Sequence, residues 1–215
     1  MRIPHPNAGG DYVPPPTGLQ PAICFLFIDE GTQKIDFKGE SKMQRKVRLG
    51  FELTDETRED GKPYTITSRF TWSMSEKAAL RGALESWRGR AFSAEEFGKF
   101  DVRALLGARC TLNLVAKPGR NGDSVVVVDG IMARPKGTEP RGKSHSAHVY
   151  FSLEPDCFDE RAFEQLLDRQ KEAIKTSPEW ALLHQKKPGR EDTGNFGHSN
   201  SGGRFEKAID DEIPF

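Results

Sequence analysis

The sequence predicts a mainly β protein with helices: a five-stranded barrel interrupted by a helical segment and followed by a helical extension and an acidic tail. Apolar and polar residues alternate along several segments, which is typical of strands. Between the third and fourth of these segments, the apolar residues recur at helical spacing. Beyond residue 185, Gly, Ser, Asn and charged residues dominate, so that part buries too little apolar surface to fold. We therefore expect an extended Pro-rich arm (1–18), a barrel domain (19–158), a helical extension (159–185) and a disordered tail (186–215).

Composition limits the classes of protein to consider. The chain has 215 residues, of which 35% are hydrophobic and 30% charged, and it has no apolar run of the roughly 18 residues that a membrane span needs. The N-terminus lacks the apolar run of a secretory signal, so we expect a cytoplasmic location. The three cysteines lie far apart among apolar residues, which indicates reduced, packed thiols and no metal site; they are Cys24, Cys110 and Cys157.

The formal net charge is zero, which by itself argues against a nucleic-acid partner. The distribution is uneven, however. Residues 1–157 hold 23 Lys and Arg against 20 Asp and Glu, whereas residues 158–215 hold 9 against 12. A mildly basic body with an acidic end is compatible with binding a polyanion.

Three strands are expected first. The apolar run 22–28 predicts a buried strand that ends at the turn-forming Asp29-Glu30-Gly31. Residues 46–53 alternate, which places Val47, Leu49, Phe51 and Leu53 inward and Lys46 and Arg48 outward. After a turn at 60–63, the alternation from Tyr64 to Trp72 predicts the third strand.

A helical block follows. Ser73 and Glu76 form a capping-box pattern before a helix that should end at Gly89. Ser93 and Glu96 form a second capping box, with Phe92 and Phe97 at the positions of a hydrophobic staple. Asp101 should cap one more turn, which Gly107 closes.

Two strands complete the barrel, at 110–115 and at 124–128 with an extension to Ile131, joined by a loop that contains Asn121-Gly122. Three strands, helices and two strands is the order of an OB-fold barrel, although other small barrels can share it. Beyond it, Asp159 should cap a helix to about Lys175, with Phe158 and Phe163 as a staple. Ser177-Pro178 should start a shorter helix through His184.

The chain ends Asp210-Asp211-Glu212-Ile213-Pro214-Phe215. An acidic segment followed by Ile-Pro-Phe and a free carboxylate resembles the C-terminal tip of bacterial single-stranded DNA-binding proteins, with Glu212 where an Asp is usual. The resemblance implies that this tip docks in a hydrophobic, basic pocket on DNA-processing partners. An apolar anchor beside carboxylates suits such a pocket. The alternative is a solvated acidic tail that only aids solubility.

The body also resembles a family of phage-encoded OB-fold single-stranded DNA-binding proteins, over about residues 19–158. The motifs that carry this resemblance are Ile28-Asp29-Glu30-Gly31-Thr32-Gln33, Arg45-Lys46-Val47-Arg48, Glu85-Ser86-Trp87-Arg88-Gly89-Arg90, Phe100-Asp101 and Leu105-Leu106-Gly107. It implies a role in replication, recombination or repair in a bacterial host, with single-stranded DNA and the host or phage proteins of those processes as partners.

OB folds bind single strands across their second and third strands and the adjoining loops. A cationic track for phosphates is therefore expected from Lys42, Arg45, Lys46, Arg48, Arg69, Lys117 and Arg120. Base stacking needs exposed aromatic rings, for which Phe37, Tyr64 and Trp72 are candidates. For Tyr64 and Trp72 the alternative is packing in the core.

Two further basic groups have open roles. The segment after the barrel either wraps DNA or is a solvated linker; it contains Arg134, Lys136, Arg141, Lys143, His145 and His148. Arg88 and Arg90 either contact phosphate or cap the helix C-terminus through its dipole.

No catalytic, metal-binding or cofactor motif is recognisable, so we expect a binding protein without a cofactor and not an enzyme. Asp29, Glu30 and Asp36 cluster near the first strand, which keeps a nuclease or nuclease subunit as an alternative. A third possibility is a protein-interaction scaffold in which only the tip is functional. A homo-oligomer is compatible with the sequence.

Overall fold

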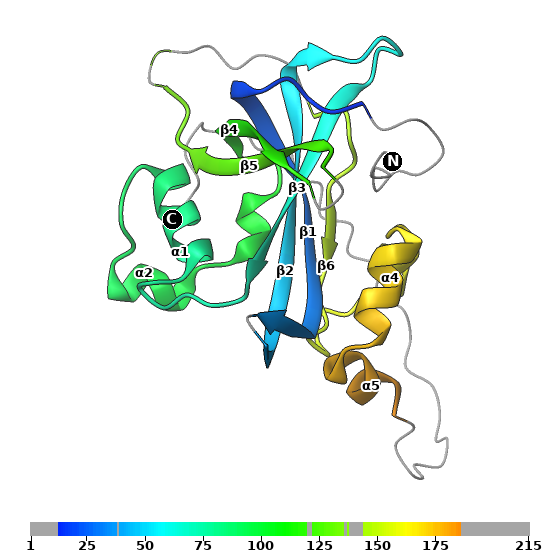
Figure 1. Cartoon of the computed structure of the whole chain (residues 1–215). Helices are drawn as coiled ribbons and strands as arrows, with labels where there is room; N and C mark the ends of the chain where they lie inside the picture. The colour runs from blue at the N-terminus through cyan, green and yellow to red at the C-terminus, as the bar shows by residue number, and fades with distance from the viewer. Residues whose placement is uncertain (1–12, 38, 120–121, 136, 138–143, 186–215) are drawn as a thin grey trace, which may run out of the picture.

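The computed structural model describes residues 13–37, 39–119, 122–135, 137 and 144–185. A mainly β architecture with helices is confirmed (Figure 1). The strands are β1 (Gly18–Phe37), β2 (Glu40–Thr57), β3 (Pro63–Thr71), β4 (Arg109–Pro118), β5 (Ser124–Met132) and β6 (Val149–Phe151). They form one sheet in the order β3-β2-β1-β4-β5, with β6 paired to β1 off this path. The predicted number of five strands is therefore wrong, because β6 is a three-residue strand that the sequence pattern did not show.

Neighbours in this order are antiparallel, and only β6 pairs in parallel among the described strands. The two outermost strands of the order, β3 and β5, approach each other to within 8 Å between Cα atoms. No backbone ladder joins these two strands in the described part of the chain. The sheet is therefore curled but open.

The β1–β2 hairpin is much longer than the sequence predicted. The expected end of the first strand at Asp29-Glu30-Gly31 is wrong, because a β-bulge between Asp29 and Gly31 lets pairing continue from Thr32↔Arg45 to Phe37↔Glu40. Gly31 has φ of 69°, a left-handed conformation that glycine adopts without a steric penalty. A turn-forming tripeptide therefore acts here as a bulge within one strand.

The first core fills the concave side of the curled sheet. The inward set predicted on β2 is confirmed, since Val47, Leu49, Phe51 and Leu53 are at most 2% exposed. Trp87 packs edge-on against Phe51 with ring centroids 5.7 Å apart. Its indole N–H donates to the carbonyl of Arg109 at 2.7 Å, so this buried polar group is satisfied.

The helical block between β3 and β4 covers this core and contains α1 (Ala79–Arg88), α2 (Ala94–Lys99) and the 3₁₀ turn η1 (Val102–Leu105). The predicted cap at Ser73 is wrong, because that hydroxyl accepts a hydrogen bond from the Ser75 N–H in a local turn and α1 begins later. The caps at Ser93 and Asp101 are confirmed. Gly89 ends α1 in the left-handed conformation, also as predicted.

A second core lies on the opposite face of β1. There Leu26 and Ile28 pack with Phe151 of β6 and with the helical extension, made of α3 (Glu160–Glu164), α4 (Asp168–Lys175) and α5 (Pro178–His184). The single helix predicted from Asp159 to Lys175 is divided in two, because the chain turns at 165–167 and buries Leu166 in this core. The caps at Asp159 and Ser177 are confirmed.

Polar contacts also fasten the extension to the long hairpin. The carboxylate of Glu179 accepts hydrogen bonds from the Thr32 N–H at 2.8 Å and from the Thr32 hydroxyl at 2.5 Å. The Gln33 side chain donates to the carbonyl of Ala173 at 2.8 Å. Burial disfavours the ionised form of Glu179, but the hydrogen bonds from Thr32 outweigh it and lower its pKa.

Gly31→Ala should destabilise the protein by about 2 kcal/mol or more. A left-handed backbone costs an L-residue about 1–2 kcal/mol, and the new Cβ would lie 2.5 Å from the Cβ of Ser177. Gly61→Ala is the matched control, because Gly61 has φ of 76° but no atom within 4 Å of the position that a Cβ would take. Urea unfolding should show a clearly larger loss for Gly31→Ala; equal losses would mean that the contact with α5 is not tight.

Candidate nucleic-acid interface

The bulge on β1 buries two carboxylates that point to opposite faces of the sheet. Glu30 is 1% exposed and Asp29 is 3% exposed. We call the face of β1–β3 that lies opposite the first core the outer face; it carries Glu30 and continues into the second core. Because an ionised carboxylate is costly to bury alone, each needs cationic or N–H partners nearby.

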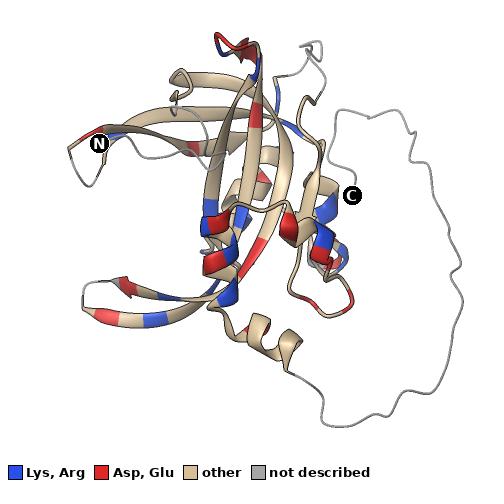
Figure 2. Cartoon of the chain, turned by 90° about the vertical axis from the view of Figure 1, so that its right-hand side faces the viewer, with Lys and Arg blue, Asp and Glu red and all other residues tan. Residues whose placement is uncertain are grey.

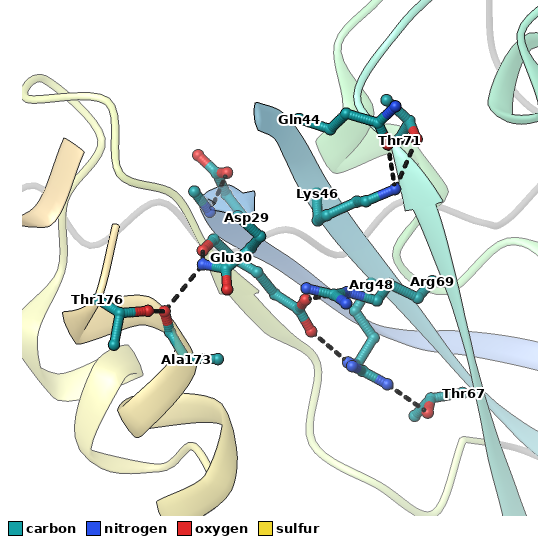
Figure 3. Close-up of polar contacts among 12 residues, drawn as sticks. Asp29, Glu30, Gln44, Lys46, Arg48, Thr67, Arg69, Thr71, Ala173 and Thr176 are labelled. Atoms are coloured by element: carbon teal, nitrogen blue, oxygen red, sulfur yellow. Dashed lines mark hydrogen bonds and ion pairs between the residues drawn. The ribbon is translucent and has the colours of Figure 1, made fainter. Parts of the chain in front are cut away.

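Glu30 is held between two arginines on the outer face. Its carboxylate accepts from the Nε–H of Arg48 at 2.6 Å and from the Nε–H of Arg69 at 2.5 Å (Figure 3). Arg48 and Arg69 are directly opposite each other on β2 and β3, so their side chains share one face. Arg48 also donates to the Thr67 hydroxyl at 3.2 Å. One buried carboxylate thus fixes the orientation of two guanidinium groups.

Lys46 extends this cationic surface toward the end of β3. Its ammonium group donates to the Gln44 side-chain oxygen and the Thr71 hydroxyl, each at 2.8 Å (Figure 3). Burial and the positive charge of Arg69 lower the pKa of Lys46, while Glu30 acts in the opposite sense. The main cause of the lowered pKa is burial, and the repulsion from Arg69 is the smaller contribution. We call Lys46, Arg48 and Arg69, with Glu30 beneath them, the cationic cluster.

The cationic cluster combines order with partial exposure. The side chains of Arg48 and Arg69 remain 25% and 35% exposed, so they are reachable from solvent. A guanidinium has five N–H donors in a rigid fork. The contact of Arg69 with Glu30 uses only its Nε–H. Three cations over one carboxylate leave a local positive excess, whereas acidic and basic segments are interspersed elsewhere along the hairpin (Figure 2).

Arg45 is on the inner side of β2 instead. It pairs with Asp29 at 2.5 Å, and the hydrogen bond to that carboxylate raises the pKa of Arg45. Asp29 also accepts from the Gly31 N–H at 3.0 Å and the Leu153 N–H at 3.2 Å. Asp29 therefore ties the bulge to the chain that follows β6.

The other predicted basic residues lie apart from the cationic cluster. Lys42, near the hairpin end, pairs with Glu40 at 3.0 Å, and Lys117 on β4 pairs with Asp129 of β5 at 2.7 Å. Arg120 falls outside the described residues. Of the six predicted cations that the structure describes, three therefore belong to the cationic cluster.

Two of the three predicted stacking residues, Tyr64 and Trp72, are not freely exposed. Tyr64 and Trp72 are partly buried against the first core, and Trp72 packs edge-on against Phe27 at 5.8 Å. The side chain of Phe37 is not among those described, and neither is the tip 210–215. A base could reach only the outward part of Tyr64 or Trp72.

The two arginines at the end of α1, predicted either to contact phosphate or to cap the helix, both have a carboxylate partner. Arg88 and Arg90 pair with Glu96, whose pKa is held well below its usual value mainly by the Arg88 hydrogen bonds and then by Arg90.

The segment after β5 is held by Glu52 of β2. This buried carboxylate accepts hydrogen bonds from the N–H groups of His145 at 2.6 Å and Ser146 at 2.8 Å. Glu52 thus fastens the end of that segment to the outer face.

Two of the three cysteines are packed in the core, as predicted. Cys24 and Cys110 are fully buried, and burial raises the pKa of Cys24 to about 12 and that of Cys110 well above its usual value. Cys157 is only partly buried, with its sulfur 3.0 Å from Nη2 of Arg103. Sequence reasoning missed Arg103 and Tyr150 beside it, because nothing in the linear pattern shows that 100–103 and 150–157 meet.

Neither a metal centre nor a membrane-spanning helix is found among the described residues. No group of three His, Cys, Asp or Glu side chains is arranged to hold a metal ion in the part of the chain described. No helix within the described ranges is long and apolar enough to cross a membrane. Comparisons of the chain with protein-family models, with curated proteins and with solved structures found no match.

Glu30→Gln should lower the free energy of unfolding by about 3 kcal/mol, because it leaves two partly buried guanidinium groups without their shared carboxylate. Glu40→Gln is the matched control, since that side chain is 72% exposed in its pair with Lys42 and should change stability by less than about 0.5 kcal/mol. Urea unfolding measures both. If the two variants unfold at the same urea concentration, Glu30 does not organise the cluster.

Proposed function

We propose that this protein binds single-stranded DNA without sequence specificity through the outer face of β2 and β3. The observation that carries the proposal is the cationic cluster, in which buried Glu30 orients Arg48 and Arg69 beside Lys46. Fixed cations lose little side-chain entropy when they bind phosphate. Contacts to phosphates do not depend on base identity, which fits sequence-independent binding.

The strand order supports an OB-type barrel as the scaffold. An OB barrel opened between its third and fifth strands has the order β3-β2-β1-β4-β5, with helices between the third and fourth strands. In such a barrel, ligands cross strands two and three, which is where the cationic cluster lies. The preference for single strands over duplex comes from this scaffold and from the sequence resemblances described above.

The acidic end supports a second activity, recruitment of other proteins. Asp210, Asp211 and Glu212 with Ile213-Pro214-Phe215 offer an apolar anchor and several carboxylates to a basic-rimmed pocket. Together, capture of single strands and recruitment of DNA-processing proteins suit replication, recombination or repair of a phage genome in a bacterial host.

Lys46→Gln should weaken binding of a dT oligonucleotide about tenfold at low salt, since a hydrogen bond to a charged group is worth about 1.5 kcal/mol or more. The slope of log K against log salt should fall by about 0.7 for one lost phosphate contact. Lys99→Gln is the control, because Lys99 is 75% exposed on α2 and lies outside the cluster. Fluorescence anisotropy at several salt concentrations, with a duplex of equal length alongside, measures both effects.

Equal affinity for duplex and single strand would contradict the proposal. So would salt-insensitive binding, or equal losses in Lys46→Gln and Lys99→Gln. A chain that binds no DNA would leave the tip as its one supported activity and favour the scaffold alternative.

Deletion of residues 206–215 should tighten DNA binding and abolish capture of bacterial DNA-processing proteins, because an acidic tail competes with DNA for a basic surface. Phe215→Ala separates the two effects, since it removes the apolar anchor and keeps every acidic side chain. That variant should lose partner capture with unchanged DNA affinity. Anisotropy and affinity capture of purified partners provide the readouts; undiminished capture after the deletion would refute recruitment through the tip.

A further inference from the structure

A pocket of about 300 Å³ lies on the inner side of the β1–β2 hairpin, next to the first core. Besides β1 and β2, three other parts of the chain line it: the residue after β3, the α2–η1 junction, and β6 with the residues that follow. Its aromatic lining is Phe27, Trp72, Phe100 and Tyr150. This volume is at the lower end of the range for small-molecule sites, so it suits a planar group about the size of one nucleobase.

The aromatic lining forms a braced surface. Phe27 is 2% exposed and supports two rings, Tyr150 stacked at 5.5 Å with an interplanar angle of 14° and Trp72 edge-on at 5.8 Å. Trp72, Tyr150 and Phe100 are only partly buried, so they have surface left for a ligand. A rigid ring that presents part of its face stacks on a base at a small cost in entropy.

Cations accompany the rings. The guanidinium of Arg103 lies 4.8 Å from the Tyr150 ring centroid, and Arg45 lines the pocket in its pair with Asp29. Three carboxylates also line the pocket: Asp29, Asp101 and Glu154. Asp29 is neutralised by Arg45, and Asp101 caps η1 by accepting from the Arg103 N–H at 2.9 Å. Aromatic surface beside a partly exposed guanidinium is the chemistry that recognises a base and its phosphate.

The pocket is next to the cationic cluster, across the edge of the sheet. β3 ends at Thr71, which pairs with Lys46 and shares its face. Trp72, which follows Thr71, and Arg45, which precedes Lys46, point to the inner side. The Trp72 N–H donates to the Arg45 carbonyl at 2.8 Å, and no described β3 residue pairs with β2 beyond this point toward the hairpin end. A strand of DNA that crosses the cluster can therefore turn around this edge.

We propose that this pocket holds one nucleotide of the bound single strand, with its base against Tyr150 and Trp72 and its phosphate at Arg103. The proposal rests on the proposed function and adds a base-dependent contribution to it. Binding should therefore depend partly on bases, whereas the cationic cluster responds to phosphates alone.

The test compares a dT oligonucleotide with an oligomer of the same length made of abasic sites, which keeps the phosphates and removes the bases. Tyr150→Leu should reduce the affinity ratio between the two about tenfold, the effect of one lost stack. Phe158→Leu is the matched control, because Phe158 is a partly buried ring of the second core that does not line the pocket. Thermal unfolding checks that both variants fold.

Cys157 provides a second readout that needs no substitution in the pocket. It lines the pocket, whereas Cys24 and Cys110 are buried with raised pKa values and should react far more slowly. Saturating dT should slow alkylation of Cys157 in the full chain several-fold, and the abasic oligomer should slow it much less.

Protection of Cys157 by dT, together with a reduced base-to-abasic ratio in Tyr150→Leu, supports the pocket. Salt-sensitive dT binding with an unprotected Cys157 and an unchanged ratio would overturn the pocket and leave the proposed function standing. Absence of dT binding by the wild-type chain would overturn both. Equal changes in Tyr150→Leu and Phe158→Leu would show a structural effect only and would also overturn the pocket.

Discussion

The structure depends on how two adjacent carboxylates are buried at one β-bulge. Asp29 and Glu30 leave β1 on opposite faces, and each is nearly inaccessible to water. Neutralising them requires Arg45 on one face and Arg48 with Arg69 on the other, which fixes the register of three strands around a single point. Since a buried charge without a partner is strongly destabilising, alternative registers of the hairpin are disfavoured.

The same bulge joins the sheet to the helical extension. Gly31 allows α5 to approach closely through Ser177, while Asp29 accepts the Leu153 N–H and Thr32 donates to Glu179. The second core then covers the outer face of β1 up to the cationic cluster. The extension thus limits the open part of the outer face to β2 and β3, where the proposed DNA site lies.

Several local features were predictable because they depend on neighbours in sequence. Alternation placed Val47 and Phe51 inward, and the caps at Ser93 and Asp159 satisfy N–H groups two or three residues away. The cap predicted at Ser73 was wrong for a related reason, because its hydroxyl accepts a hydrogen bond from the nearby Ser75 N–H in a turn. In the candidate site, Lys46, Arg48 and Arg69 were predicted, but Asp29 and Glu30 were interpreted as the end of a strand.

By itself the sequence determined the period-two and helical segments, the order of three strands, helices and two strands, and the acidic Phe-terminated end. Only the tertiary structure decided that the strand continues through the bulge, that Glu30 orients Arg48 and Arg69, and that Arg103 meets Tyr150. Periodicity reports which face of its own element a residue occupies. Contacts between residues tens of positions apart depend on strand register and on the cost of burying charge, and neither can be predicted from a short stretch of the chain.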